Sequence, residues 1–371
     1  MSAQMTTAPT SPSSDSTLSQ ILRADPLTRG LQRLRFNPTG FGLLILAYAV
    51  LHTLVLPAIY GHLITAHGVM GVLEDWPYLV ILLVMTPLLA SYYLWQPETI
   101  RTLYRRIAER IGENPAAEKR AAELARPLGW PGWMWIAGLA GLAQVWFWVD
   151  DLSHRTFLSW QTVNKLMIVS GQPLRFLGFY VLVFILARQV VVLIGLNRFF
   201  TEFQVEVAPL HPDRAGGLRP LGDYVLTTGF FVAVISLNFG MTFLRAQTNL
   251  EVMTAEFYGE LAVYFILAPL LFLLPLLSVH SLMQAAKRKL LAEIAEQFDK
   301  EYRVLLDNLR RDVLNPEGVA RLEAVQKIYQ IAQTAPVWPF DLEIVSKFGA
   351  AIFLPILAPL GVELVANILA R

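Results

Sequence analysis

The sequence contains no cysteine among its 371 residues, and it contains few charged residues. The absence of cysteine excludes disulfide bonds, thiolate metal sites and thiol nucleophiles. Asp, Glu, Lys and Arg together make up only 16% of the chain, whereas hydrophobic residues make up 55% and the mean hydropathy is +0.47. A soluble protein of this length needs more charge to cover its surface, so the composition indicates an integral membrane protein.

The hydrophobic residues are concentrated in long runs, which predict the fold class. A helix needs about 20 apolar residues to cross about 30 Å of hydrocarbon. Such runs predict seven membrane-spanning helices, at residues 41–64, 76–95, 133–149, 176–196, 224–243, 258–280 and 348–369. Clusters of Trp flank the third run, as is typical of the two membrane interfaces. We therefore expect an all-α integral membrane protein.

The connecting segments alternate between rich and poor in Lys and Arg, which predicts the orientation. Segments 96–129 and 281–340 are rich in basic residues, whereas segment 61–75 contains none. By the positive-inside rule, the basic segments lie in the cytoplasm. The N-terminus is then cytoplasmic and the C-terminus lies outside. We expect the chain to be inserted in a bacterial inner (plasma) membrane.

The same patterns divide the chain into four regions. Residues 1–38 are predicted to form a disordered, basic tail, because Ser, Thr and Pro dominate the first half and no apolar signal segment is present. Residues 39–280 are predicted to form six spans with a helical cytoplasmic loop at 97–129. Residues 281–340 are predicted to form a cytoplasmic helical hairpin, and residues 341–371 hold the seventh span.

The hairpin prediction depends on a periodic stripe and a break. The apolar residues Leu290, Ile294, Phe298, Tyr302, Leu305 and Leu309 recur at three- and four-residue spacing. Such spacing predicts a helix with one apolar face, which continues from the sixth span. Asn315-Pro316-Glu317-Gly318 interrupts it, since Pro and Gly end helices. A second apolar stripe in 319–332 predicts the returning helix.

Arg188 and Gln189 lie inside the fourth predicted span. A cation at that depth needs protein or water around it. One interpretation is a pathway or sensor residue that a hydrated cavity reaches from the cytoplasm. The other is a span that begins earlier, near Met167, so that Arg188 extends to the cytoplasmic surface.

Carboxylates gather near the outer ends of the predicted spans. They could form an acidic vestibule that concentrates cations. Alternatively, they form an ion-pair network with Arg175 that holds the helices together. The candidate pathway residues are therefore Arg188, Gln189, Glu363, Glu260, Arg175, Asp150 and Asp151.

The string His211-Pro212-Asp213-Arg214-Ala215-Gly216-Gly217-Leu218 is the most distinctive motif. Its Pro, Asp and paired Gly predict a tight turn. Successive backbone N–H groups, flanked by two arginines, could bind an anion such as a lipid phosphate. The alternative is a turn that only packs the fourth span against the fifth. The candidate anion or lipid-headgroup residues are His211, Asp213, Arg214, Gly216, Gly217 and Arg219.

The sequence contains no phosphate-binding loop, serine-hydrolase elbow, zinc-protease helix or dinucleotide fingerprint. We therefore expect no catalysis, no cofactor and no metal. The basic loops suit a membrane surface better than nucleic acid, so the expected partners are the lipid bilayer and further copies of the chain.

Two functional hypotheses remain. The first is an oligomeric ion channel or permeation protein, which an enclosed polar cavity lined by Arg188 or Glu363 would favour. The second is a non-enzymatic, membrane-anchored sensor or scaffold, which a closed bundle with exposed apolar hairpin faces would favour. In layout alone (seven spans, N-terminus inside, a cytoplasmic helical extension before the last span), the chain resembles insect chemoreceptor-type channels. No motif of that family matches it residue by residue.

Overall fold

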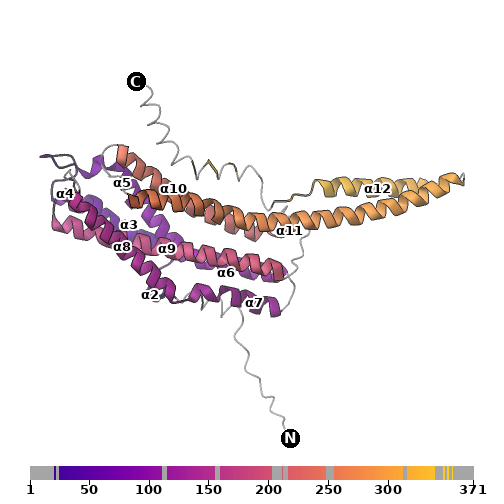
Figure 1. Ribbon diagram of the computed structural model, residues 1–371, viewed down its shortest axis with the longest axis horizontal. Helices are drawn as coiled ribbons and strands as arrows, with labels where there is room; N and C mark the ends of the chain where they lie inside the picture. The colour runs from indigo at the N-terminus through magenta and orange to yellow at the C-terminus, as the bar shows by residue number, and fades with distance from the viewer. Residues whose placement is uncertain are drawn as a thin grey trace, which may run out of the picture.

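The computed structural model describes most of the chain, and every regular element in the part that it describes is a helix. The described residues are 21, 25–110, 115–154, 159–202, 211, 216–247, 255–311, 316–338, 346, 349–350 and 353. Figure 1 shows a bundle from which one long helix projects, with a shorter helix returning beside it. The predicted helical class is confirmed.

Five helices of the described part are long and apolar enough to cross a membrane, as an integral membrane protein requires. Two of them contain a π-helical turn, and three do not. They are formed by α3 Pro38–Val50 with η1 Leu51–Val55 and α4 Leu56–Ile59, by α5 Trp76–Val80 with η3 Ile81–Met85 and α6 Thr86–Arg110, by α8 Gly132–His154, by α9 Lys165–Glu202, and by α10 Arg219–Gln247.

The remaining helices are four short elements around the bundle and the two helices of the projecting pair. They are α2 Pro26–Arg33, η2 Val72–Glu74, α7 Pro115–Ala125, η4 Arg126–Gly129, α11 Ala255–Arg310 and α12 Pro316–Gln333. The sixth predicted run lies in the first half of α11, which continues without a break into the hairpin region. The seventh predicted run, 348–369, lies outside the described residues apart from 349–350 and 353.

Polar side chains set where several helices begin. Asp25 and Asn37 cap α2 and α3, and a proline follows each of them at the first helical position. Asn164 caps α9, because its Oδ1 accepts a hydrogen bond from the N–H of Met167 at 2.9 Å. The helix that contains the fourth predicted span therefore begins at Lys165, which is close to the alternative start near Met167 and eleven residues before residue 176.

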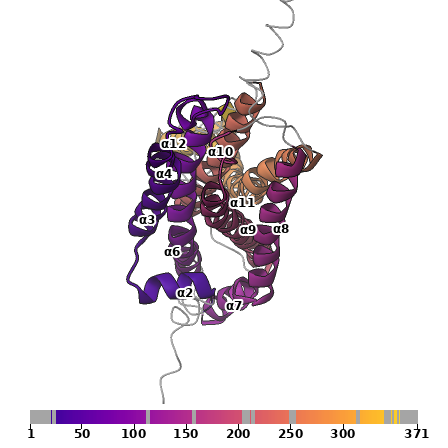
Figure 2. The same ribbon diagram turned by 90° about the vertical axis from the view of Figure 1, so that its left-hand side faces the viewer.

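Two apolar cores hold the helices together. The first joins α3, α5–α6, α9 and α10 and includes Phe41, Tyr93 and Phe231. The second lies where α6, α7, α9, α10 and α11 meet toward the projecting pair, and it includes Tyr104 and Met283. Seen from the end of the bundle in Figure 2, α3 lies at one flank, α8 at the other, and α9 between them.

The predicted orientation can be tested by labelling single cysteines, because the chain has none of its own. Asp75 is fully buried, so the better outer position is His67 on the exposed loop after α4. We expect an impermeant maleimide to label His67→Cys in intact cells. Glu317→Cys at the start of α12 should react only after the membrane is permeabilised. Labelling of Glu317→Cys but not of His67→Cys in intact cells would reverse the orientation.

Candidate functional site

A cavity of about 560 Å³ lies inside the bundle between α5–α6, α8, α9, α10 and α11. Most of its wall is apolar, and every one of these helices contributes to it. The apolar lining includes Leu82, Met85, Leu89, Phe147, Phe179, Leu182, Leu186, Phe231, Phe239, Phe257, Tyr264, Leu267 and Leu271. The π-helical turn η3 forms part of this wall, and the hydroxyl of Thr86 donates to the carbonyl of Ile81 at 2.9 Å. Turns of this kind interrupt a regular helix and often mark functional sites.

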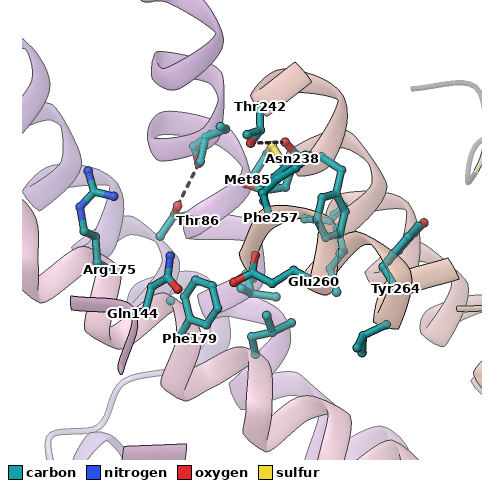
Figure 3. Close-up of a pocket in the computed structure, with 18 of the residues that line it drawn as sticks. Met85, Thr86, Gln144, Arg175, Phe179, Asn238, Thr242, Phe257, Glu260 and Tyr264 are labelled. Atoms are coloured by element: carbon teal, nitrogen blue, oxygen red, sulfur yellow. Dashed lines mark hydrogen bonds between the residues drawn. The ribbon is translucent and has the colours of Figure 1, made fainter. Parts of the chain in front are cut away.

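Polar side chains from four helices reach the same cavity. Figure 3 shows Gln144 of α8 and Glu260 of α11 pointing into it, with Arg175 of α9 nearby. Asn238 and Thr242 of α10 also line it, and the Thr242 hydroxyl donates to the carbonyl of Asn238 at 3.0 Å. The cavity therefore combines an apolar body with hydrogen-bonding groups, including both donors and acceptors.

Arg175 is held at the cavity by aromatic and amide groups. Its Nη2 donates to the hydroxyl of Tyr78 at 3.0 Å and to Oε1 of Gln161 at 3.1 Å. Its guanidinium carbon also lies 4.1 Å from the ring centroid of Trp148, a cation–π contact. These contacts orient the charge, and none of the three partners carries a formal charge of its own.

A buried ion pair lies next to Arg175 and links two distant segments. Asp75, just before α5, accepts from Nε of Arg245 at 2.8 Å and from its Nη2 at 3.0 Å. Gln161 donates from its Nε2 to Asp75 at 3.3 Å and accepts from Arg175, so one side chain bridges the two groups. The guanidinium of Arg245 lies 4.6 Å from the ring centroid of Tyr78. This network joins α5, α9, α10 and the segment before α9.

The described part of the cavity wall is partly accessible from outside the bundle. Phe147 of α8 and Val263 of α11 both line the cavity, and their exposed fractions are 46% and 54%. Asp150, also in the wall, is exposed at the end of α8. The accessible part of the wall therefore lies on α8 and α11, where apolar side chains of both helices are exposed on the outer surface of the bundle.

Arg188 is placed in a different cluster, away from the cavity lining. Its Nη1 donates to the carbonyl of Tyr93 at 2.9 Å, and its Nη2 lies 3.9 Å from Oδ2 of Asp25 and 3.4 Å from the hydroxyl of Thr28. Tyr180 donates to the other oxygen of Asp25 at 3.0 Å, and the Tyr93 hydroxyl also bonds to this carboxylate. Among the described residues, protein groups that include the cap of α2 therefore surround the guanidinium of Arg188, and a hydrated route to it stays a prediction.

The earlier start of α9 explains this position. Arg188 lies 23 residues after Lys165, which is about 35 Å along the helix at about 1.5 Å per residue. It is thus about one membrane thickness from the start of α9. Only 3% of it is exposed, so it does not extend into solvent; α2 covers it.

Gln189 points to another face of α9 and joins a second hydrogen-bonded group. Its Nε2 donates to the hydroxyl of Tyr92 at 2.9 Å. Its Oε1 accepts from the hydroxyls of Tyr224 and Thr228, the latter at 3.2 Å. All four residues are buried, and they join α6, α9 and α10 one turn beyond the cavity-lining Leu186.

The structure thus brings together three of the predicted pathway residues, namely Arg175, Glu260 and Asp150. Glu363 and the side chain of Asp151 lie outside the described residues. In the HPDRAGGL motif, Gly216 and Gly217 have φ values of 64° and 85° and form a turn directly before α10. Asp213 and Arg214 lie outside the described residues, so anion binding by this loop, with His211 and Arg219, stays a prediction.

The sequence interpretation missed Asp25, Asp75 and Arg245. Asp25 precedes Pro26, which is a helix-start signal that could have excluded it from a disordered tail. Asp75 and Arg245 lie at span ends and were used only to assign the sides of the membrane. A cross-bundle partner has no spacing signal in one sequence, because the two residues are far apart along the chain.

The buried pair between Arg188 and Asp25 leads to a stability prediction. Arg188→Leu leaves the Asp25 carboxylate buried without its cation, a loss of about 3–5 kcal/mol. We therefore expect a clear fall in the melting temperature of the detergent-solubilised protein, and a smaller fall when Asp25→Asn is combined with it. Arg303→Leu, at a side chain that is 78% exposed, is the matched control and should change little. An Arg188→Leu protein as stable as the parent would contradict the pairing.

Comparisons with protein families, with characterised proteins and with solved structures return no match to this chain, so neither a family nor the resemblance in layout to chemoreceptor-type channels receives support from them.

Proposed function

We propose that this protein is a membrane-embedded receptor that binds a small, largely apolar molecule bearing a hydrogen-bonding group. The cavity among α5–α6, α8, α9, α10 and α11 is the observation that carries this proposal. Its volume of about 560 Å³ falls in the range of roughly 300–1,000 Å³ that is typical of small-molecule sites. Apolar walls with a few convergent polar groups are also typical of such sites.

The chemistry of the wall defines the class of ligand. The aromatic and aliphatic lining would bury an alkyl chain or a ring, which is favourable by about 25 cal/mol per Å² removed from water. The amides of Gln144 and Asn238 offer both donors and acceptors, and Glu260 offers an acceptor. Asp75 and Arg245 form an ion pair of their own, and Tyr78, Gln161 and Trp148 hold the guanidinium of Arg175. A ligand with one hydroxyl, carbonyl or amide group fits these surroundings.

The accessible wall on α8 and α11 supports entry from the bilayer. The exposed faces of these helices are apolar, with Leu139, Leu142 and Trp146 on α8 and Ile266 and Leu270 on α11. A molecule that dissolves in hydrocarbon is concentrated there before it reaches the cavity. An apolar ligand would thus avoid crossing the polar network of Asp75 and Arg245.

The side chains beyond Leu186 favour a closed binding site over an open passage through the bundle. One turn beyond Leu186, the Gln189 group of buried, hydrogen-bonded side chains crosses the bundle, and the second apolar core follows it. Within the described residues the cavity therefore ends inside the bundle. The permeation hypothesis also relies on Glu363, which is not among those residues, and it stays a prediction.

The continuity of α11 connects the cavity to the projecting hairpin. Seven residues of α11 between Phe257 and Leu271 line the cavity, and the same helix continues to Arg310. Near the hairpin base, Lys287 donates to the carbonyls of Gln333 and Ala335 at 2.6 and 2.8 Å. His280 stacks on Trp338 with ring centroids 4.1 Å apart. A displacement of the cavity wall in α11 would therefore move the hairpin as well.

Photolabelling tests the cavity directly. We predict that an eight-carbon alcohol with a diazirine labels cavity-lining peptides of α8, α9 and α11 saturably, and that excess octanol competes with it. Gly178→Phe should weaken this labelling about tenfold or more, because its ring would occupy part of the cavity. Gly178 lines the cavity, and no atom lies within 4 Å of the position that a Cβ would take there. The readout is peptide mass spectrometry on protein in lipid nanodiscs.

Gly138→Phe is the matched control for that experiment. Gly138 is also a helical glycine with open space at its Cβ, but it does not line the cavity. Both substitutions change helix propensity alike. Equal labelling of the two variants, or labelling that never saturates, would show that the alcohol binds only at the lipid-facing surface and would overturn the proposal.

A further inference from the structure

One face of the short helix α2 packs on the bundle, and the opposite face is basic. Thr28 and Leu31 are buried on the inner face, where Leu31 joins the first apolar core. On the outer face and in the turn that follows it, three exposed arginines accompany one leucine whose exposed fraction is 70%. We refer to these four residues as the α2 basic face: Arg29, Arg33, Leu34 and Arg35.

The α2 basic face has a fixed position because polar contacts fasten α2 to the bundle. Asp25 caps α2 by accepting from the N–H of Thr28 at 2.9 Å. The same carboxylate accepts from Tyr180 at 3.0 Å and lies 3.9 Å from the guanidinium of Arg188. Arg35 has a φ of 59°, so the chain turns sharply before α3 begins. Figure 2 shows α2 at a steep angle to α3 and α6, so α2 runs across the bundle rather than along it.

The lengths of two spans place α2 at one membrane boundary. The span at Pro38–Ile59 has 22 residues, which is about 33 Å of helix at about 1.5 Å per residue. Arg188, which α2 covers, lies about 35 Å along α9 from Lys165. The loops at the far ends of these two helices meet, because the N–H of Trp160 donates to the carbonyl of Met70 at 3.0 Å. Both lengths are close to the hydrocarbon thickness of about 30 Å, so α2 lies at the level of lipid headgroups.

The α2 basic face carries an excess of positive charge. The chain contains no Asp or Glu at residues 26–73, and the carboxylate of Asp25 is already paired with Arg188. Among the described residues, neither Arg33 nor Arg35 forms an ion pair. Exposed basic side chains next to a membrane span attract anionic lipids, because such lipids give the membrane surface a negative potential. The charge of this face therefore complements an anionic membrane surface.

The exposed leucines beside this charge favour a phospholipid over a free phosphate ion. A free phosphate would need only the guanidinium groups, each of which can bind two phosphate oxygens. Leu34 lies between two of the arginines in the sequence, and Leu43 and Leu44 continue an exposed apolar surface on α3. A phospholipid matches both parts, because its phosphate faces the arginines while an acyl chain lies along α3.

We infer that the α2 basic face binds the phosphate groups of anionic phospholipids, with Leu34 among their acyl chains. The inference is independent of the proposed ligand, because it rests on α2 and not on the cavity. A lipid that binds only the folded protein stabilises it by mass action. This lipid also holds the helix that supplies Asp25 to Arg188. Anionic lipid therefore stabilises the bundle through α2.

Thermal unfolding in two lipids tests the inference. We expect phosphatidylglycerol to raise the melting temperature of the detergent-solubilised protein more than phosphatidylcholine with the same acyl chains does. Arg33→Gln combined with Arg35→Gln should lose most of this difference. The matched control, Arg310→Gln combined with Arg321→Gln, removes two charges from the hairpin at side chains that are 79% and 68% exposed, and it should keep the difference. An unchanged difference in the α2 variant, an equal loss in both variants, or the same rise with inorganic phosphate at the same concentration would overturn the inference.

The surroundings of Leu34 give a second measurement. A bimane fluorophore on Leu34→Cys reports contact with acyl chains at one position, because the chain has no other cysteine. In nanodiscs that contain both lipids, we expect spin-labelled acyl chains on phosphatidylglycerol to quench it more than the same chains on phosphatidylcholine. When Arg33→Gln and Arg35→Gln are added, the two lipids should quench it alike. Equal quenching by both lipids in the protein that keeps its arginines, or no quenching by either lipid, would contradict the inference.

Discussion

The constraint on which this structure depends is that a charge inside an apolar bundle needs a partner from the protein itself. Hydrocarbon cannot hydrate a carboxylate or a guanidinium, and an isolated charge there is costly. The chain meets this constraint with pairs between distant segments. Asp25 before α2 meets Arg188 of α9, and Asp75 before α5 meets Arg245 at the end of α10. Each pair joins a short N-terminal or loop element to a long span.

Buried polar groups lie on two sides of the cavity. The Arg188 and Gln189 groups fill the interior on one side of the cavity with hydrogen-bonded side chains. The Asp75 and Arg245 network occupies the other side, where Arg175 joins it through Gln161. Between the two lies the apolar cavity, whose accessible wall is on α8 and α11. Buried hydrogen-bond networks tend to hold helices in one arrangement, whereas apolar side chains can repack around a guest.

Much of the helical framework was predictable, because long apolar runs and periodic stripes are local features. Hydropathy alone predicts a start at residue 176 and leaves an earlier start near Met167 as the alternative, whereas the Asn164 cap sets the start of α9 at Lys165. Arg188 stands out in the sequence as a cation that needs protein or water around it, and a hydrated cavity is one of the two interpretations of its position. Its partner, Asp25, was not found, because it lies in a segment whose composition resembles a disordered tail. Arg175, Glu260 and Asp150 are predicted as pathway residues because they are charged and lie near the outer ends of the predicted spans. Their meeting at one cavity depends on how three helices pack, which spacing does not encode.

The single helix α11 relates the cavity to the projecting hairpin. Its first turns form part of the cavity wall, and its second half projects from the bundle beside α12. Lys287 and His280 of the same helix contact the end of α12 and the segment after it. If a ligand prefers one tilt of α11 and a partner of the hairpin prefers the same tilt, each binding event strengthens the other by the same factor, since coupling between two binding equilibria is reciprocal. A ligand indifferent to the tilt would leave the hairpin unchanged however tightly it bound.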